Sequence, residues 1–295
     1  MRRTRSGKRI ELTARDIAIF KLLRQYRYLR STYIRAFVGG ASATRFKERL
    51  GDLFHEGYLD RPAQQWEYAN AKNRPAVYQI GTGALRALQA AGEASEDARA
   101  FLRGGTHRQF LHSLMICEVL ASMELATRAT PGLRFIAWPE ILARAPDATR
   151  ASEAPFRLPL PSGGYLVPDG VFGIEYRSSG ASSYRFFALE ADRGTMPVAR
   201  SREGQTSYLG KLTSYREIVS RRVHKSHLAI STFLVLTLTT SDARLSELIR
   251  RLEGERDIAT FLFKSVSTDA LRNPTPELLG DPWERAGLPP LVVID

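Results

Sequence analysis

Apolar side chains recur at helical spacing through the first sixty residues of this chain. The pattern predicts three helices, whose capping residues are Thr13, Ser31 and Ser42. The third helix buries Phe46 and is stopped by Gly57. Two strands and a further helix are predicted at residues 58–59, 76–80 and 84–89. This part of the chain is therefore expected to form a compact helical module that ends in a hairpin and a helix.

The rest of the chain mixes helical and strand-like runs. Helices are predicted over about 106–127, 202–221 and 244–252. Strands are predicted over 133–138, 165–167, 171–176, 184–191 and 228–238. Strands interspersed with helices predict a central mixed sheet flanked by helices, so the fold class expected for the whole chain is α+β.

A change in composition marks the expected domain boundaries. Residues 91–105 are small and polar, which is typical of a linker. The first domain is therefore expected over 10–90 and the second over 106–272. The proline-rich tail, 273–295, is expected to be irregular, with a candidate edge strand over 291–294.

Positive charge is concentrated at the beginning of the chain. Residues 1–90 contain 18 Lys and Arg and 7 Asp and Glu, a net charge of +11, while the whole chain carries +12. Such a surplus attracts polyanions, and the nearly neutral remainder indicates a separate domain with a different task.

The order of elements in the basic region resembles the winged helix–turn–helix domains of bacterial DNA-binding proteins. In those domains the third helix enters the major groove and the hairpin touches the phosphate backbone. The DNA-binding residues that this resemblance implies are Thr44, Arg45, Lys47 and Arg49 on the third helix, and Arg61, Lys72 and Arg74 around the hairpin. The alternative is that these are ordinary solvated charges on a scaffold used for protein contacts.

Composition and motifs exclude several other classes. The single cysteine, Cys117, rules out an intrachain disulfide and a cysteine-cluster zinc site. The sequence contains no phosphate-binding loop, nucleophile elbow or dinucleotide fingerprint. The most apolar stretch, 228–238, is too short to span a bilayer, so a cytoplasmic protein without membrane contact is expected.

Acidic residues gather at one end of a predicted hairpin. A turn at residues 179–180 sets Asp169 across from Glu190 within one position. Asp192 faces the same side of the strand as Glu190. Like charges so placed need a cation or a hydrogen-bond donor among them, and Mg²⁺, or Mn²⁺ in its place, accepts one or two carboxylates together with phosphate oxygens. Alternatively, the acids form ion pairs with Arg193 and Lys211.

Several segments of the second domain resemble the replication-relaxation family, whose core is similar to the PD-(D/E)xK nuclease fold. The matching segments are residues 167–170, 187–195 and 211–215, together with His112 and Glu118 on the long helix. The resemblance implies that Asp169 and Glu190 bind Mg²⁺, with Asp192 and Glu118 as further metal ligands. The nuclease lysine is expected two residues after Glu190, where this chain has Asp192, so Lys211 is the candidate catalytic replacement.

The sequence thus predicts a winged helix joined to a nuclease-like α/β domain. The expected protein binds double-stranded DNA and acts in replication, mobilisation or transfer of a plasmid or mobile element, through a nuclease-like domain that need not be catalytic. A second copy of the chain and a relaxase or other mobile-element protein are further candidate partners. Two alternatives remain open: a Mg²⁺-dependent endonuclease or nickase, and a transcriptional repressor with a ligand-sensing or dimerising C-terminal domain.

Overall fold

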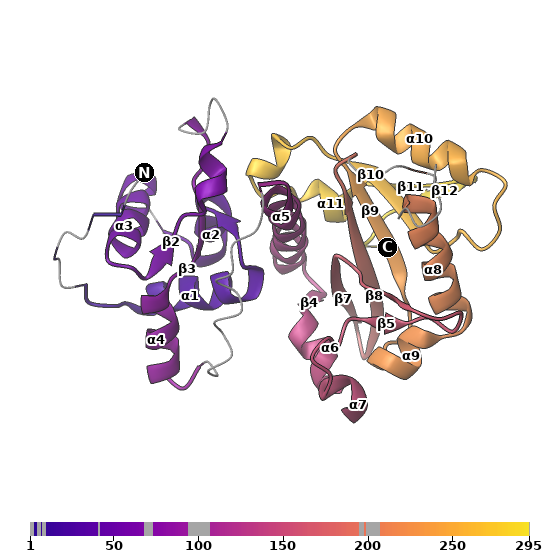
Figure 1. Cartoon of the computed structure of the whole chain (residues 1–295), viewed down its shortest axis with the longest axis horizontal. Helices are drawn as coiled ribbons and strands as arrows, with labels where there is room; N and C mark the ends of the chain where they lie inside the picture. The colour runs from indigo at the N-terminus through magenta and orange to yellow at the C-terminus, as the bar shows by residue number, and fades with distance from the viewer. Residues whose placement is uncertain are drawn as a thin grey trace. The chain divides into compact units, whose positions relative to one another are not determined.

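The chain folds into two compact units with the α+β class expected from its sequence (Figure 1). Unit 1 comprises residues 1–125 and 269–274, and unit 2 comprises residues 126–268 and 275–295. The computed structural model describes residues 3–4, 7, 10–40, 42–67, 73–93, 107–194, 198 and 207–294. Most of the predicted linker, 91–105, lies outside the described residues.

Unit 1 contains the predicted helices and hairpin and one additional short strand. Its elements are α1 (Ala14–Tyr26), β1 (Leu29–Arg30), α2 (Ser31–Val38), α3 (Ala43–His55), β2 (Leu59–Asp60), η1 (Ala63–Trp66), β3 (Val77–Ile80), α4 (Thr82–Ala90), α5 (His107–Ala129, grouped with unit 1 up to Leu125) and η4 (Ala270–Arg272). Strands β1 and β2 pair antiparallel with the two sides of β3. The side chains of Phe20, Leu23, Leu50 and Leu53 are buried in the core that these elements share.

The helix caps of unit 1 follow the sequence at two of three positions. Thr13 caps α1 in a reciprocal capping box with Asp16, and the Ser42 side chain caps α3. The prediction that Ser31 caps the second helix was wrong, because Ser31 is already the first residue of α2. The chain enters α2 directly from β1, and the Ser31 N–H donates to the carbonyl of Ala76 instead.

Helix α5 is the long helix that the sequence analysis assigned to the second domain, and most of its length belongs to unit 1. Phe110, Leu114, Cys117 and Ala121 on this helix join the core of unit 1. Among the described residues, α5 is the one helix long and apolar enough to cross a membrane, and 67% of the segment concerned is buried. A core helix has these properties as well.

Unit 2 is built on a seven-stranded sheet, counted over the described residues, in the order β12-β11-β10-β9-β8-β7-β4. Its elements are β4 (Leu133–Ile136), α6 (Trp138–Arg144), α7 (Asp147–Arg150), β5 (Leu158–Pro159), β6 (Tyr165–Leu166), β7 (Gly170–Ser178), β8 (Ala181–Asp192), α8 (Tyr208–Ser220), α9 (Val223–Leu228), β9 (Leu234–Thr239), α10 (Asp242–Leu252), β10 (Phe261–Ser265), α11 (Glu277–Gly280), β11 (Trp283–Arg285) and β12 (Leu288–Leu291). Strands β8, β9 and β10 run parallel, and the outer strands are antiparallel to their neighbours.

Helices α8 and α10 lie along one side of this sheet (Figure 1). Tyr215 and Ile218 of α8 and Leu248 of α10 pack into one core with Ala188 and Val235 of the sheet. Residues that alternate with these on the strands, including Phe187, Leu189 and Leu236, are buried as well. The central strands are thus covered on both faces, which explains why their sequences are almost continuously apolar.

Two predicted strands of unit 2 have different bounds in the structure. The run 228–238 was predicted as one strand, but α9 occupies the chain up to Leu228, and the strand begins only at Leu234. Ala229 ends the helix in a left-handed conformation with φ of 56°, so the apolar run is broken by a helix end. The candidate edge strand forms at Leu288–Leu291 instead of 291–294, pairing with β11.

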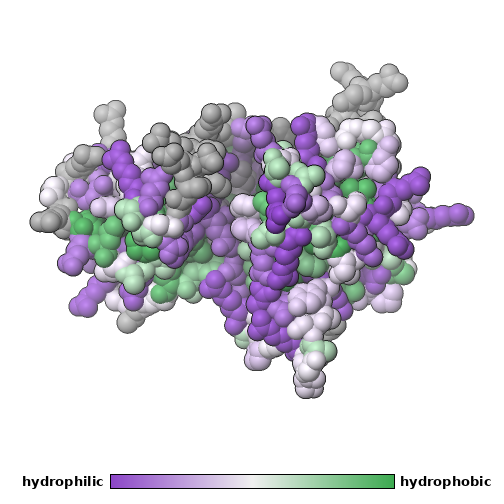
Figure 2. All heavy atoms as spheres, turned by 90° about the horizontal axis from the view of Figure 1, so that it is seen from below, coloured by the Kyte–Doolittle hydropathy of each residue, from purple (hydrophilic) through white to green (hydrophobic). Residues whose placement is uncertain are grey.

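The surface on the face seen in Figure 2 is mostly hydrophilic, with hydrophobic side chains in smaller separate areas. The large hydrophobic side chains that stay exposed, among those described, all belong to unit 2. They are Trp138, Tyr165, Val167, Tyr184 and Leu288.

Candidate functional site

Three elements of unit 2 bring Asp169, Glu190 and Lys211 together. Asp169 immediately precedes β7, Glu190 is near the end of β8, and Lys211 is in the first turn of α8. The β7–β8 ladder runs from Ser178↔Ala181 to Gly170↔Leu189, so Asp169 and Glu190 are the next residues on the two strands. The turn and the register that the sequence predicted are therefore confirmed.

Direct contacts join these side chains into a carboxylate–lysine site, which we define as Asp169, Glu190, Lys211 and Tyr215. The Lys211 Nζ lies 2.5 Å from Glu190 Oε2 and 4.0 Å from Asp169 Oδ1. The Tyr215 hydroxyl donates to Glu190 Oε1 at 2.6 Å. Asp169 Oδ2 accepts a hydrogen bond of 2.9 Å from the N–H of Ala191. Both oxygens of Glu190 are thus engaged by donors on α8.

Burial dominates the electrostatics of this site. The residue Glu190 is only 3% exposed, and burial, reinforced by the charge of Asp169, raises its pKa to about 7 despite the nearby ammonium. Burial by itself would lower the pKa of Lys211, but the charges of Glu190 and Asp169 outweigh it, and the pKa is raised. The lysine therefore stays charged, while Glu190 changes its protonation state near neutral pH.

The other two proposed metal ligands have different partners. Asp192 Oδ2 accepts from Arg244 Nε on α10 at 2.6 Å, and its Oδ1 accepts from the N–H of Gly194. Glu118 lies in unit 1, where the Nε of Arg30 donates to it at 2.5 Å. Burial raises the pKa of Glu118 to about 7, against the charge of Arg30.

The carboxylate–lysine site offers a metal ion two carboxylates, Asp169 and Glu190, and both already have hydrogen-bond partners. No group of three or more His, Cys, Asp or Glu side chains that could hold a metal ion is found in the part of the chain that the structure describes. The ammonium of Lys211 takes the position against Glu190 in which a cation would balance the charge of the carboxylate. The ion-pair alternative drawn from the sequence is thus observed for Lys211.

The predicted DNA-binding residues of α3 fall into two groups. Thr44, Arg45 and Lys47 are exposed. Arg49 instead binds the buried carboxylate of Asp16 through Nε at 3.1 Å and Nη2 at 2.6 Å. Burial alone would raise the pKa of Asp16, but the hydrogen bonds from Arg49 and Thr13 outweigh it and hold the pKa below its ordinary value. Arg49 therefore joins α3 to the first turn of α1.

The basic residues of the predicted hairpin loop are placed differently. The Arg61 guanidinium donates to the Tyr78 hydroxyl at 2.6 Å and lies over the rings of Phe54 and Tyr78. Arg74 is half-buried just before β3. Lys72 lies outside the described residues.

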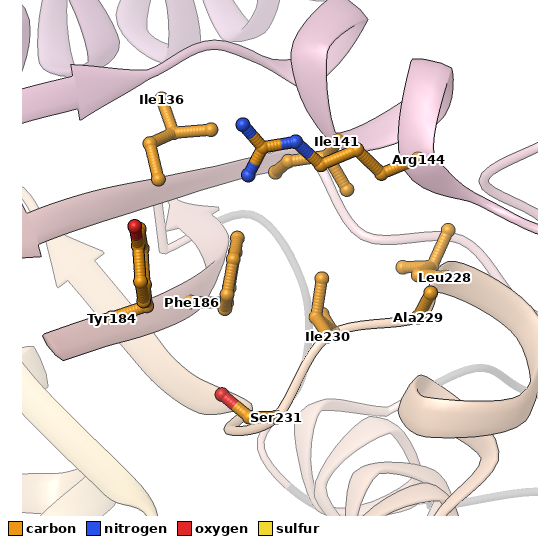
Figure 3. Close-up of a pocket in the computed structure, with 9 residues that line it drawn as sticks. All are labelled: Ile136, Ile141, Arg144, Tyr184, Phe186, Leu228, Ala229, Ile230 and Ser231. Carbon is orange, nitrogen blue, oxygen red and sulfur yellow. The ribbon is translucent and has the colours of Figure 1, made fainter. Parts of the chain in front are cut away.

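One cavity of unit 2 lies apart from these charged groups. It has a volume of about 200 Å³, and apolar side chains such as Ile136, Phe186 and Ile230 line most of it (Figure 3). The Arg144 side chain reaches along its edge and binds Glu140 at 2.8 Å. The cavity therefore lacks the convergent polar groups of a catalytic site.

Comparison with known protein families identifies the family of this chain. The model of the replication-relaxation family matches residues 20–233, which is most of the chain. The chain belongs to the replication-relaxation family. Membership indicates a role in the replication or mobilisation of plasmids and other mobile elements. No curated protein and no solved structure matches this chain.

In this replication-relaxation protein, two residues that were not predicted as site residues bind the predicted carboxylates: Tyr215 binds Glu190, and Arg244 binds Asp192. Tyr215 stands four residues after Lys211, so helical spacing was a usable signal that both could reach one carboxylate. Arg244 reaches Asp192 from 52 residues further along the chain. No local pattern connects these two residues, and only the packing of α10 on the sheet, against β9 and β10, does so.

Proposed function

We propose that this protein binds double-stranded DNA through unit 1 while acting in the replication or mobilisation of a plasmid or mobile element. The observation that carries this proposal is the exposed face of α3, which presents Thr44, Arg45 and Lys47 in a region with a net charge of +11. The helices and the β2–β3 hairpin follow the order of a winged helix, in which α3 is the helix that enters the major groove.

A cavity at the beginning of α3 supports a phosphate contact there. Its volume is about 270 Å³, and Arg15, Arg45 and Arg49 line it together with Ser42, the N-cap of α3. Arg49 is already bound to Asp16, so Arg15 and Arg45 are the side chains we assign to the phosphate. The partial positive charge of a helix N-terminus favours an anion at this position.

We assign to unit 2 a nuclease-like fold whose site is non-catalytic. Asp169 and Glu190 take the positions of the two acids of that fold, but Glu190 is bound by Lys211 and Tyr215. Lys211 is partly exposed, so its ammonium can contact a phosphate while it remains on the carboxylate. Because the proposal needs no divalent ion, DNA binding should be the same with and without Mg²⁺.

Fluorescence anisotropy with a labelled duplex tests the binding proposal. The R45A/K47A variant should bind more weakly and should reduce by about two the slope of log K against log salt concentration. The R86A variant is the matched control, since Arg86 is an exposed arginine of α4 outside the proposed contact. Equal losses in both variants, or no binding by the wild type at low salt, would overturn the proposal.

The convergence of Asp169, Glu190 and Lys211 favours a second candidate function, an active Mg²⁺-dependent endonuclease. A plasmid-nicking assay distinguishes it from the non-catalytic assignment. Supercoiled plasmid is incubated with Mg²⁺ or Mn²⁺ and either the wild type or the D169A/E190A variant. We expect the two proteins to leave equal amounts of nicked plasmid. Nicking that the double substitution removes would establish the endonuclease instead.

A further inference from the structure

One exposed aromatic ring of unit 2 lies four residues before Asp169 of the carboxylate–lysine site. Tyr165 on β6 is 52% exposed, the largest exposed fraction among the large hydrophobic side chains described. The guanidinium of Arg157 lies over one face of its ring, 3.3 Å from the ring centroid. A guanidinium stacked on tyrosine holds the ring by cation–π attraction and leaves the opposite face for another flat group.

The segment after Tyr165 leads directly to Asp169. Exposed and buried residues alternate strictly here, with Tyr165 and Val167 outward and Leu166 and Pro168 inward. Residues two apart on an extended chain face the same side, so Tyr165 and Val167 form one row, and Asp169 follows two residues later at a bend that leads into β7. At roughly 3.3 Å per residue, the backbones of Tyr165 and Asp169 are at most about 13 Å apart.

This row is held by a hairpin that is bound to α8. Strand β5 pairs antiparallel with β6, Pro159 opposite Tyr165. Ser162, at the hairpin turn, donates from its hydroxyl to Glu217 of α8 at 2.6 Å. Because α8 also carries Lys211, one helix fixes both the aromatic ring and the ammonium. A site supported in this way is pre-organised.

We infer that Tyr165, backed by Arg157, is a stacking platform for an unpaired base of single-stranded DNA. The base lies on the open face of the ring, Val167 contacts the sugar, and the backbone passes toward the ammonium of Lys211. Bases inside a duplex are already stacked on each other, so only an unpaired base can use this ring; aromatic platforms beside positive charge are a general means of binding single strands. The inference rests on the proposed DNA-binding function and adds the substrate class of unit 2.

The test uses the full chain and a labelled oligothymidine in fluorescence anisotropy. The Y165A variant should bind about 5- to 150-fold more weakly, the range expected for loss of one base–aromatic stack. Y165F keeps the ring and should stay within about twofold of the wild type, which separates stacking from any effect of the hydroxyl. Y184A is the matched control, because Tyr184 is another exposed tyrosine of unit 2, at 38% exposure.

A second readout follows the stack directly. An oligonucleotide that contains 2-aminopurine should lose fluorescence when it binds the wild type and Y165F, and should keep it with Y165A. If Y165A binds the oligonucleotide as well as the wild type, while duplex binding still depends on Arg45 and Lys47, the platform is wrong and the proposed function stands. If the wild type binds neither duplex nor single strand, both proposals fail. If Y165A loses binding and also melts at a lower temperature, and if Y165F is equally impaired, the role of Tyr165 is purely structural.

Discussion

The two units use charged residues in opposite ways. In unit 1 the decisive cations of the proposed DNA contact, Arg45 and Lys47, lie on the surface of α3. In unit 2 the cation Lys211 is only partly exposed and is bound to Glu190, a residue that is only 3% exposed. Surface charge attracts a polyanion with little geometric demand, whereas a buried pair depends on exact placement and on pH.

The contrast also exists within one helix. Arg45 and Arg49 are four residues apart on α3, yet Arg45 is exposed and Arg49 is bound to Asp16. The same residue type thus serves binding at one position and stability at the other. The difference is decided by whether a carboxylate of another helix lies within reach.

The largest effect is expected when the ion pair between Arg49 and Asp16 in unit 1 is removed. The R49A substitution leaves Asp16, which is 1% exposed, buried without its cation, so the free energy of unfolding should fall by about 3 kcal/mol. The loss should shrink at acid pH, because the lowered pKa of Asp16 gives stability that is present above the ordinary aspartate range and lost as pH falls through the folded-state value. Urea denaturation at pH 7 and at pH 3 measures the loss of stability and its decrease at acid pH.

R45A is the control for that experiment and should change the stability by no more than about 0.5 kcal/mol, as expected for an exposed side chain. If R45A and R49A cost the same, the division of α3 into binding and structural arginines is wrong.

In unit 2, the pH dependence of stability tests the effect of burying Glu190. The pKa of Glu190 is raised from its ordinary value of 4.5 to about 7 in the folded protein. The protonated side chain therefore stabilises the fold fully below pH 4.5, and this stability is lost as pH rises through 7. Between pH 5 and pH 8 the wild type should therefore lose about 2 kcal/mol that the E190Q variant keeps. Urea denaturation at a series of pH values measures the difference, and parallel curves for the two proteins would contradict it. Glu118, with a pKa also raised to about 7, is unchanged in both proteins.

The smallest expected effect concerns the hydroxyl of Tyr215. Y215F removes one hydrogen bond to Glu190 and keeps the buried ring, so the free energy of unfolding should fall by about 1 kcal/mol. The ion pair of Glu190 with Lys211 remains. Y208F is a matched variant on the same helix, because the Tyr208 hydroxyl is hydrogen-bonded to the Thr237 hydroxyl. A larger pH dependence in Y215F than in Y208F is expected, since only Tyr215 donates to a titrating group.

Features governed by neighbours in the chain were predictable. The β7–β8 register followed from the turn at residues 179–180, and it put Asp169 beside Glu190. Helix α3 followed from its apolar spacing and from Ser42. Such features depend on residues close in sequence, where periodicity and capping are strong signals.

Features governed by distant elements were not predictable. Leu228 was expected in a strand and ends a helix, because the apolar run itself does not distinguish a buried helix end from a buried strand. Arg244 was not expected beside Asp192, since the two residues are far apart in the chain and only the tertiary fold brings them together.

By itself, the sequence determined most helices of unit 1, the hairpin that pairs two acids and the concentration of positive charge in the first ninety residues. Only the tertiary structure decided which charges are exposed and which are partnered: Arg45 against Arg49 in unit 1, and Lys211 on Glu190 in unit 2. The physical reason is that the pKa and the partners of a charged group depend on burial and on elements that approach from elsewhere in the chain, which no local pattern records.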